Sequence, residues 1–275
     1  MDENEAVYQA ILEAIRGNQP ACVLTIVEVR GSTPREAGTK MLLRADGSTV
    51  GTIGGGTLEA TALADAKEAL ARGESRLATY SLLGQGEGDL GVCGGEVRVF
   101  IEVLRPKNTL LIAGAGHVAQ QLAAIAHLLG FRTVVMDPRP EVACRERFPH
   151  ADELVVAPFE QLLEKVTITP QTYVVIVTQG HQYDDLVLRQ VVSTPAAYIG
   201  MIGSRRKVRT VFENLVREGV PKEKLAQVYA PVGLRTGGQT PAEIALSIMA
   251  EITLVQHGGT GEPMSWRDNP LRAQE

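Results

Sequence analysis

In the second half of the chain, short apolar runs alternate with longer stretches whose apolar residues recur at helical spacing. The run at residues 173–177 is apolar at every position, which is typical of a strand buried on both faces, as in a parallel sheet. An alternation of such strands with helices predicts a Rossmann-like, doubly wound parallel sheet. Strands are expected at residues 109–113, 132–136, 153–156, 172–178 and 197–201, and helices at residues 117–129, 159–165, 184–192 and 205–217.

The first hundred residues have a different pattern, which predicts a mixed α+β domain. Asp46-Gly47 lies between two short β-type runs and indicates a hairpin turn. Three consecutive glycines, residues 54–56, precede an alanine-rich helical stretch. Helices are expected at residues 6–16 and 58–71, and strands at residues 22–29, 40–44, 49–53, 76–83 and 96–104.

A polar segment that contains a proline, residues 105–108, separates these two patterns and is typical of a linker. We therefore expect an N-terminal α+β domain at residues 1–104 and a Rossmann-like dinucleotide-binding domain at residues 109–257. The last helix should begin at the capping sequence of residues 240–243. Residues 258–275 are rich in glycine, proline and polar residues, which predicts a loose tail.

The composition limits the classes of partner and the cellular compartment that we expect for this protein. The 275 residues carry a net charge of −5 with both signs interleaved, which argues against nucleic acid as a partner. The sequence has no run of about eighteen apolar residues, so we expect no membrane span. Its acidic N-terminus does not fit a signal peptide, and its three cysteines do not fit a disulfide framework or a zinc site. We therefore expect a cytoplasmic protein with reduced thiols.

A glycine-rich loop after the strand at residues 109–113 is the strongest indication of a ligand. Gly114, Gly116 and Ala119 form a G-x-G-x-x-A sequence that opens a helix, and Asp137 ends the next strand. In such loops the first glycine permits a tight turn and the second lets a pyrophosphate approach the backbone. Asp137 occupies the position that binds an unphosphorylated ribose, which points to NAD. The alternative is a tight turn in a domain that has lost its ligand.

Other polar residues follow the predicted strands at the edge where ligands gather. His117 lies within the glycine-rich loop, and His181 follows the fourth strand of the second domain. Either histidine is a candidate base or a residue with a structural hydrogen bond. Gly203, Ser204 and Arg205 open a helix and form a second candidate anion site, for which the alternative is a serine N-cap. We predict no catalytic residue and no metal site of the protein's own.

Cys93 differs from the other two cysteines in its surroundings. It follows a glycine-rich polar loop and precedes Gly94 and Gly95, whose lack of side chains would expose the thiol to a ligand. The alternative is a small buried residue. Cys22 lies in an apolar strand and is expected in the core, while Cys144 lies in a charged stretch and has no expected role.

These motifs together resemble those of the xanthine dehydrogenase accessory proteins, the XdhC/CoxI-type family, over about residues 5–257. The chain differs from the family pattern at Thr39, at Gln179 and at residues 233–238, and the last two departures bear on the ligand rather than on the fold. The matching segments are residues 31–35, 38–41, 51–56, 58–59, 93–95, 114–119, 137–139, 180–181, 198–207 and 240–245.

The resemblance implies a cofactor-binding chaperone more than an enzyme. Such proteins bind molybdenum cofactor (molybdopterin), help its sulfuration with a cysteine desulfurase, and deliver it to the apo-enzyme of a xanthine dehydrogenase-type molybdenum hydroxylase. The resemblance also implies that the Cys93 thiol contacts the cofactor. It leaves open the pterin's dinucleotide form and whether the chain forms a homodimer.

Three functions therefore compete. The first is the molybdenum cofactor chaperone, which would give a purpose to residues 54–56 and 93–95. The second is an NAD-dependent oxidoreductase, which rests on the glycine-rich loop and Asp137. The third is an interaction protein with an empty pocket. Retained molybdenum and pterin would favour the first function, and saturable NADH binding with turnover would favour the second.

Overall fold

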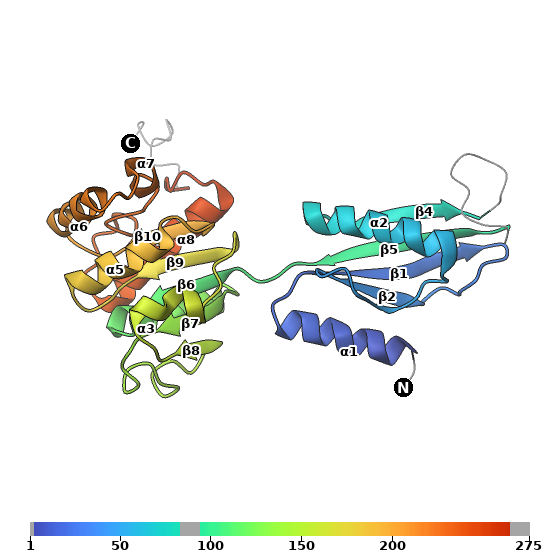
Figure 1. The fold of residues 1–275 in the computed structure, drawn as a ribbon, viewed down its shortest axis with the longest axis horizontal. Coiled ribbons are helices and arrows are strands. Elements are labelled where there is room, and N and C mark those ends of the chain that lie inside the picture. Colours follow the sequence, from blue (N-terminus) through green and yellow to red (C-terminus); the bar gives the residue numbers. More distant parts are fainter. Residues whose placement is uncertain (1–2, 83–93, 265–275) are drawn as a thin grey trace, which may run out of the picture. The chain divides into compact units, whose positions relative to one another are not determined.

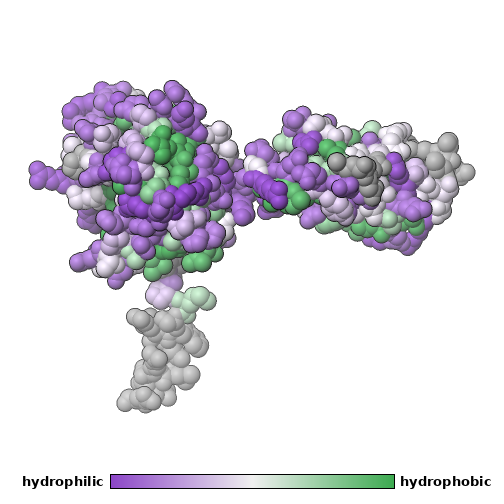
Figure 2. Space-filling model, turned by 90° about the horizontal axis from the view of Figure 1, so that it is seen from below, coloured by the Kyte–Doolittle hydropathy of each residue, from purple (hydrophilic) through white to green (hydrophobic). Residues whose placement is uncertain are grey.

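The computed structural model describes residues 3–82 and 94–264, and it divides the chain into two compact units, Met1–Pro106 and Lys107–Glu275 (Figure 1). Hydrophilic residues cover most of the surface seen in Figure 2, with hydrophobic residues interspersed. Within the described parts of the chain, no helix is both long and apolar enough to cross a membrane.

The first unit contains a five-stranded sheet of order β3-β2-β1-β5-β4 in which all neighbouring strands are antiparallel. The predicted hairpin is confirmed, because β2 pairs with β3 and Gly47 adopts a positive φ of 86° in the turn. The elements are α1 (Glu3–Arg16), β1 (Ala21–Arg30), β2 (Lys40–Arg44), β3 (Thr49–Gly51), α2 (Gly56–Arg72), β4 (Arg76–Ser81) and β5 (Glu96–Leu104).

Alternate residues of β1 enter two separate apolar clusters. Cys22 belongs to the cluster that contains the α2 alanines, and Val23 belongs to the cluster that contains Val7 of α1. Cys22 is fully buried, and its thiol donates a hydrogen bond to the carbonyl oxygen of Ala66 at 3.4 Å. Burial raises the pKa of this thiol to about 11. The prediction that Cys22 is a core residue is confirmed.

The second unit confirms the predicted doubly wound parallel sheet. Its strand order is β10-β9-β6-β7-β8, and every pair of neighbours is parallel. The strand order reverses at β6, so a crevice opens where the chain leaves the carboxyl ends of β6 and β9. The strands are β6 (Thr109–Ala113), β7 (Arg132–Met136), β8 (Glu153–Val155), β9 (Thr172–Ile176) and β10 (Tyr198–Met201).

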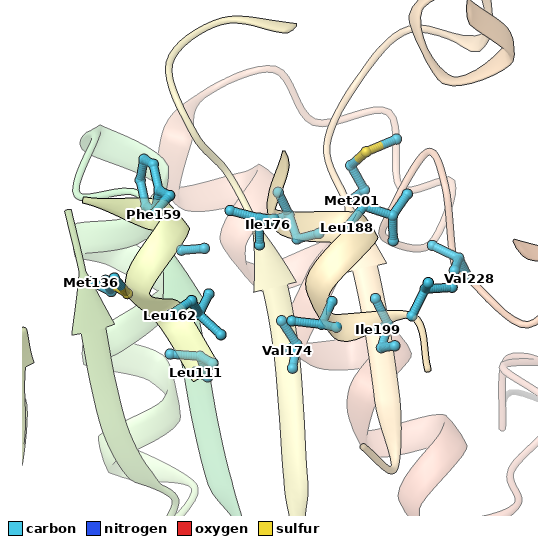
Figure 3. Close-up of a cluster of buried hydrophobic side chains, with 14 of the residues drawn as sticks. Leu111, Met136, Phe159, Leu162, Val174, Ile176, Leu188, Ile199, Met201 and Val228 are labelled. Carbon is cyan, nitrogen blue, oxygen red and sulfur yellow. The ribbon is translucent and has the colours of Figure 1, made fainter. Parts of the chain in front are cut away.

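Helices cover both faces of this sheet. Alternate strand residues such as Leu111 and Val174 pack with α5 and α6 in the cluster of Figure 3, while Leu110 and Tyr173 pack with α3 and α8 on the opposite face. The helical elements are α3 (His117–Leu128), the 3₁₀ turn η1 (Phe159–Gln161), α4 (Leu162–Lys165), α5 (His181–Val191), α6 (Arg205–Arg217), α7 (Lys222–Leu225) and α8 (Pro241–His257).

In this unit the start of α5 and the form of residues 159–165 differ from the prediction, and the predicted cap of α8 is confirmed. Helix α5 begins at His181, immediately after Gly180 with a φ of +105°, so His181 opens a helix and does not lie in a loop. The stretch predicted as one helix at residues 159–165 is a 3₁₀ turn followed by one α-helical turn. The predicted capping box at α8 is confirmed by reciprocal hydrogen bonds between Thr240 and Glu243.

Candidate functional site

A cavity of about 520 Å³ lies at the carboxyl edge of the second sheet, and we call it the β6–β9 cavity. The segments that follow β6, β7, β9 and β10 and the first residue of α8 all contribute to its wall. The lining residues are Ala115, Gly116, His117, Val118, Arg139, Val142, Arg147, Val177, Thr178, Gln179, Ile202 and Pro241. This is the place where doubly wound folds bind ligands.

Gly114 makes the turn from β6 into α3 possible. Its φ is +110°, and a Cβ atom there would lie 2.5 Å from the carbonyl oxygen of Val177 and 2.9 Å from the Cα atom of Thr178. Both obstacles are backbone atoms at the end of β9, so no side-chain movement can relieve them. Ala119, the last residue of the loop motif, is fully buried where α3 packs on the sheet. Gly114 and Ala119 therefore serve the fold.

Gly116 differs from Gly114 because no contact among the described residues requires a glycine there. It is the N-cap of α3 with a φ of −75°, and a Cβ atom would meet no other atom within 4 Å. The same residue lines the β6–β9 cavity, and the exposed His117 follows it. Because the N-cap residue is a glycine, no N-cap side chain accepts a hydrogen bond from the backbone N–H groups at the start of α3. The space beside Gly116 therefore suits a ligand that approaches the backbone.

The structure places Asp137 behind the cavity wall. Its side chain is 1% exposed and accepts four hydrogen bonds: from the Ala115 N–H at 2.9 Å, the Arg139 N–H at 3.0 Å, and the guanidinium of Arg139 at 2.8 and 2.9 Å. Burial alone would raise the pKa of Asp137, but these hydrogen bonds outweigh it and lower the pKa below its usual value. Four bonds use the acceptor capacity of both oxygens, which leaves none for a ribose hydroxyl.

Arg139 takes the position in the cavity wall that the glycine-rich motif predicted for Asp137. Its Nη1 atom donates to the side-chain oxygen of Gln179, another lining residue. Arg147 also lines the cavity, and its guanidinium forms no hydrogen bond or ion pair with the described residues. Sequence reasoning did not single out these arginines, although Arg139 lies in the family segment at residues 137–139.

The second candidate anion site contains a helix cap. Ser204 is the N-cap of α6, and its Oγ atom accepts a hydrogen bond from the Lys207 N–H at 3.2 Å. The Lys207 ammonium forms an ion pair with Asp184, which is fully buried and also accepts a hydrogen bond from Thr178 Oγ1 at 2.6 Å. A second cavity of about 620 Å³ is lined by Ser204 and Lys207, and neither Gly203 nor Arg205 is among its lining residues. The serine N-cap alternative describes the observed geometry.

Glycine-rich loops of the first unit meet at one end of its sheet. A Cβ atom on Gly31 would lie 3.0 Å from the carbonyl oxygen of Gly94, and one on Gly95 would lie 2.2 Å from that of Ser32. A Cβ atom on Gly54 would lie 2.7 Å from the ring of Pro34. The absence of side chains therefore allows Gly31 and Gly95 to pack against neighbouring backbone, and Gly54 to pack against the Pro34 ring. We call this set, residues 31–35, 54–56 and 94–95, the glycine cluster.

Glu59 holds the glycines that precede α2. Its carboxylate accepts hydrogen bonds from the Thr52 hydroxyl and from the N–H groups of Ile53 and Gly55, both at 3.1 Å. Gly54, Gly55 and Gly56 all have positive φ angles, which side-chain-bearing residues rarely adopt. The Glu59 carboxylate thus supplies a negative charge and hydrogen-bond acceptors at the N-terminus of α2.

Cys93 lies outside the described residues, next to the glycine cluster in the chain. Its neighbour Gly94 has a φ of +77°, and none of the described residues comes within 4 Å of its Cβ position. Cys144 is partly buried and contacts the Glu141 carbonyl oxygen at 3.7 Å. Among the residues that the structure describes, no three histidine, cysteine or acidic side chains are grouped so that they could hold a metal ion.

Two family models match the chain. The XdhC Rossmann domain matches residues 110–252, and the XdhC and CoxI family matches residues 14–81. The chain belongs to the XdhC family. The first match contains every lining residue of the β6–β9 cavity, and the second contains residues 31–35 and 54–56 of the glycine cluster.

Three curated relatives of this XdhC-family chain differ in length. Escherichia coli K12 YqeB, described as uncharacterized, is 38% identical over 92% of this chain and 47% of its own length. A Bacillus subtilis 168 protein, described as a probable component of xanthine dehydrogenase, is 34% identical over 56% of this chain and 44% of its own length. The E. coli K12 molybdenum cofactor insertion chaperone PaoD is 23% identical, and the match covers 93% of this chain and 89% of PaoD. The chain thus spans less than half the length of the first two relatives.

A solved structure also resembles this XdhC-family chain. The crystal structure of a Bacillus halodurans protein described as a xanthine dehydrogenase has a TM-score of 0.52 and 26% sequence identity. The match covers 94% of this chain and 98% of that one. The likeness supports the mixed α/β architecture with its parallel five-stranded sheet.

Proposed function

We propose that the chain is an accessory factor that binds molybdenum cofactor as cargo, supports its sulfuration, and delivers it to a xanthine dehydrogenase-type molybdenum hydroxylase. The observation that carries the proposal is the match to a molybdenum cofactor insertion chaperone over 93% of this chain and 89% of that protein. It acts, in this proposal, in the cytoplasm and with a cysteine desulfurase. The family motifs of both units support it.

The glycine cluster suits a carrier. A single soft thiolate binds molybdenum more loosely than a closed set of thiolates would, and a carrier must release what it holds. Gly94, beside Cys93, is exposed, and no atom of the residues that the structure describes lies within 4 Å of its Cβ position. These residues therefore leave room on that side of the cluster. In the proposal, Cys93 is the cofactor contact, and Gly94 and Gly95 keep the backbone beside it free of side chains.

NAD-dependent oxidation is the second candidate, and the G-x-G-x-x-A loop favours it. The hydrogen bonds of Asp137 weigh against it, because the carboxylate has no acceptor left for the ribose of NAD. A dehydrogenase would show saturable NADH binding and turnover, whereas the proposed accessory factor would show no turnover.

Activation of an apo-hydroxylase tests the proposed function. The chain, purified from cells that make molybdenum cofactor, is mixed with a cofactor-free molybdenum hydroxylase from the same organism, a cysteine desulfurase and L-cysteine. We expect hydroxylase activity to rise with the amount of chain added, because each chain delivers its cargo. The same protein purified from cells that cannot make the cofactor is the control and should activate nothing. Equal activation by both preparations, or by neither, would contradict the proposal.

A further inference from the structure

The charges on the wall of the β6–β9 cavity all have one sign. Arg139 and Arg147 line it, and no carboxylate is among its lining residues. Asp137, the acid that binds Arg139, is buried and is saturated with hydrogen bonds. A cavity of this kind favours an anion over a neutral hydroxyl group.

We propose that the β6–β9 cavity binds a phosphate monoester and selects a phosphorylated ligand over its unphosphorylated counterpart. This inference deepens the proposed function and rests on it only for the identity of the natural ligand. A phosphate monoester carries nearly two negative charges at neutral pH and has three oxygens that accept hydrogen bonds. Arginine guanidinium groups match that geometry with paired donors.

Arg139 is held in position for such a role. Asp137 binds its Nε and one terminal nitrogen, and the remaining terminal nitrogen points to Gln179 on the wall. The side chain of Arg139 is 38% exposed, while that of Asp137 is 1% exposed. Hydrogen bonding to Asp137 raises the pKa of Arg139, so its charge is secure. Asp137 is thus a positioning residue in this inference.

Arg147 supplies the uncompensated charge. Arg139 and Asp137 nearly neutralise each other, whereas Arg147 has no partner among the described residues. The α3 N-terminus beside Gly116 adds backbone N–H donors to the same wall. A ligand with a pyrophosphate at Gly116 would extend its next sugar toward the end of β7, from which Arg139 follows.

Two pairs of probes, each differing by one phosphate, test the inference and separate the sources of that phosphate. The first pair is NADPH and NADH, titrated by nicotinamide fluorescence. The second is the oxidised fluorescent pterin obtained from molybdopterin, before and after phosphatase treatment. We expect the phosphorylated member of at least one pair to bind tenfold or more tightly than its partner. The pair that shows the preference identifies the source.

Arg147→Gln is the decisive variant, because Arg139→Gln would leave the buried Asp137 unpaired and could impair folding. Arg147→Gln should reduce the preference to threefold or less, because the affinity for the phosphorylated probe falls further than the affinity for the unphosphorylated one. Arg132→Gln is the matched control, since Arg132 begins β7 at the opposite edge of the sheet and pairs with Glu153. It should retain the full preference.

The inference is overturned if neither pair shows a preference, including the case in which no probe binds, or if Arg147→Gln keeps the preference of the parent protein. These outcomes are independent of the apo-hydroxylase assay. A chain that activates the hydroxylase but shows no preference retains the proposed function and loses this inference. A chain that prefers NADPH without activating the hydroxylase retains this inference and loses the proposed function.

Discussion

Replacing Gly114 by alanine should destabilise the Lys107–Glu275 unit by about 3 kcal/mol, from backbone strain at a positive φ together with overpacking. The new Cβ atom would lie 2.5 Å from the Val177 carbonyl oxygen, and the backbone of β9 cannot retreat without disturbing the sheet. For a unit of this size, the melting temperature should fall by roughly 6–12 °C. Differential scanning calorimetry of the purified variant measures the shift.

Gly116→Ala is the matched control for this prediction. It adds the same methyl group two residues later, where φ is −75° and no atom lies within 4 Å of the Cβ position. Its melting temperature should stay within about 2 °C of the parent's, as for a surface substitution away from any special feature, while its affinity for a ligand of the β6–β9 cavity falls. Equal melting temperatures for Gly114→Ala and the parent protein would show that the turn does not require a glycine.

Cys93→Ser should lower the molybdenum retained per chain about tenfold or more, because a hard hydroxyl replaces the soft thiolate that binds the metal. The substitution changes the size of the side chain little, so the melting temperature should remain that of the parent. Metal analysis by mass spectrometry, together with thermal melts, measures both quantities on protein from cells that make the cofactor.

The other two cysteines provide controls for that experiment. Cys144→Ser changes a partly buried thiol in the second unit and should leave both molybdenum content and stability unchanged. Cys22→Ser places a hydroxyl in the core of the first unit, where it should lower stability by about 1 kcal/mol or more without a specific loss of molybdenum. Full molybdenum loading of a folded Cys93→Ser protein would refute the proposed contact.

The strands of the second unit could be predicted because their pattern is local. Apolar runs such as residues 173–177 lie between polar segments, so the sequence predicts the ends of these strands to within two residues. Helix α5 was predicted to begin three residues late, because Asp184 belongs to a polar stretch that resembles a loop. Asp184 is in fact buried in the first turn of α5, where Lys207 and Thr178 stabilise its charge.

The site could be predicted only in part, because the sequence shows local patterns but not the contacts between segments that are distant in the chain. Spacing alone identified the loop of Gly114 and Gly116 and the acid that ends β7. It could not show that the Ala115 N–H and Arg139 would occupy the carboxylate of Asp137, because those hydrogen bonds depend on how the loops meet in space. Arg147 lies in a charged, aperiodic stretch that gives no indication of a cavity.

The proposal that the chain binds molybdenum cofactor is tested by identifying the molecules that the native protein retains on purification. Protein purified without denaturation from cells that make molybdenum cofactor is analysed for molybdenum by metal mass spectrometry and for pterin by fluorescence after oxidation. We expect molybdenum and pterin in equal amounts, bound to the parent chain and reduced together in Cys93→Ser. A well-folded parent chain that carries neither, or that carries a nicotinamide nucleotide in their place, would contradict it.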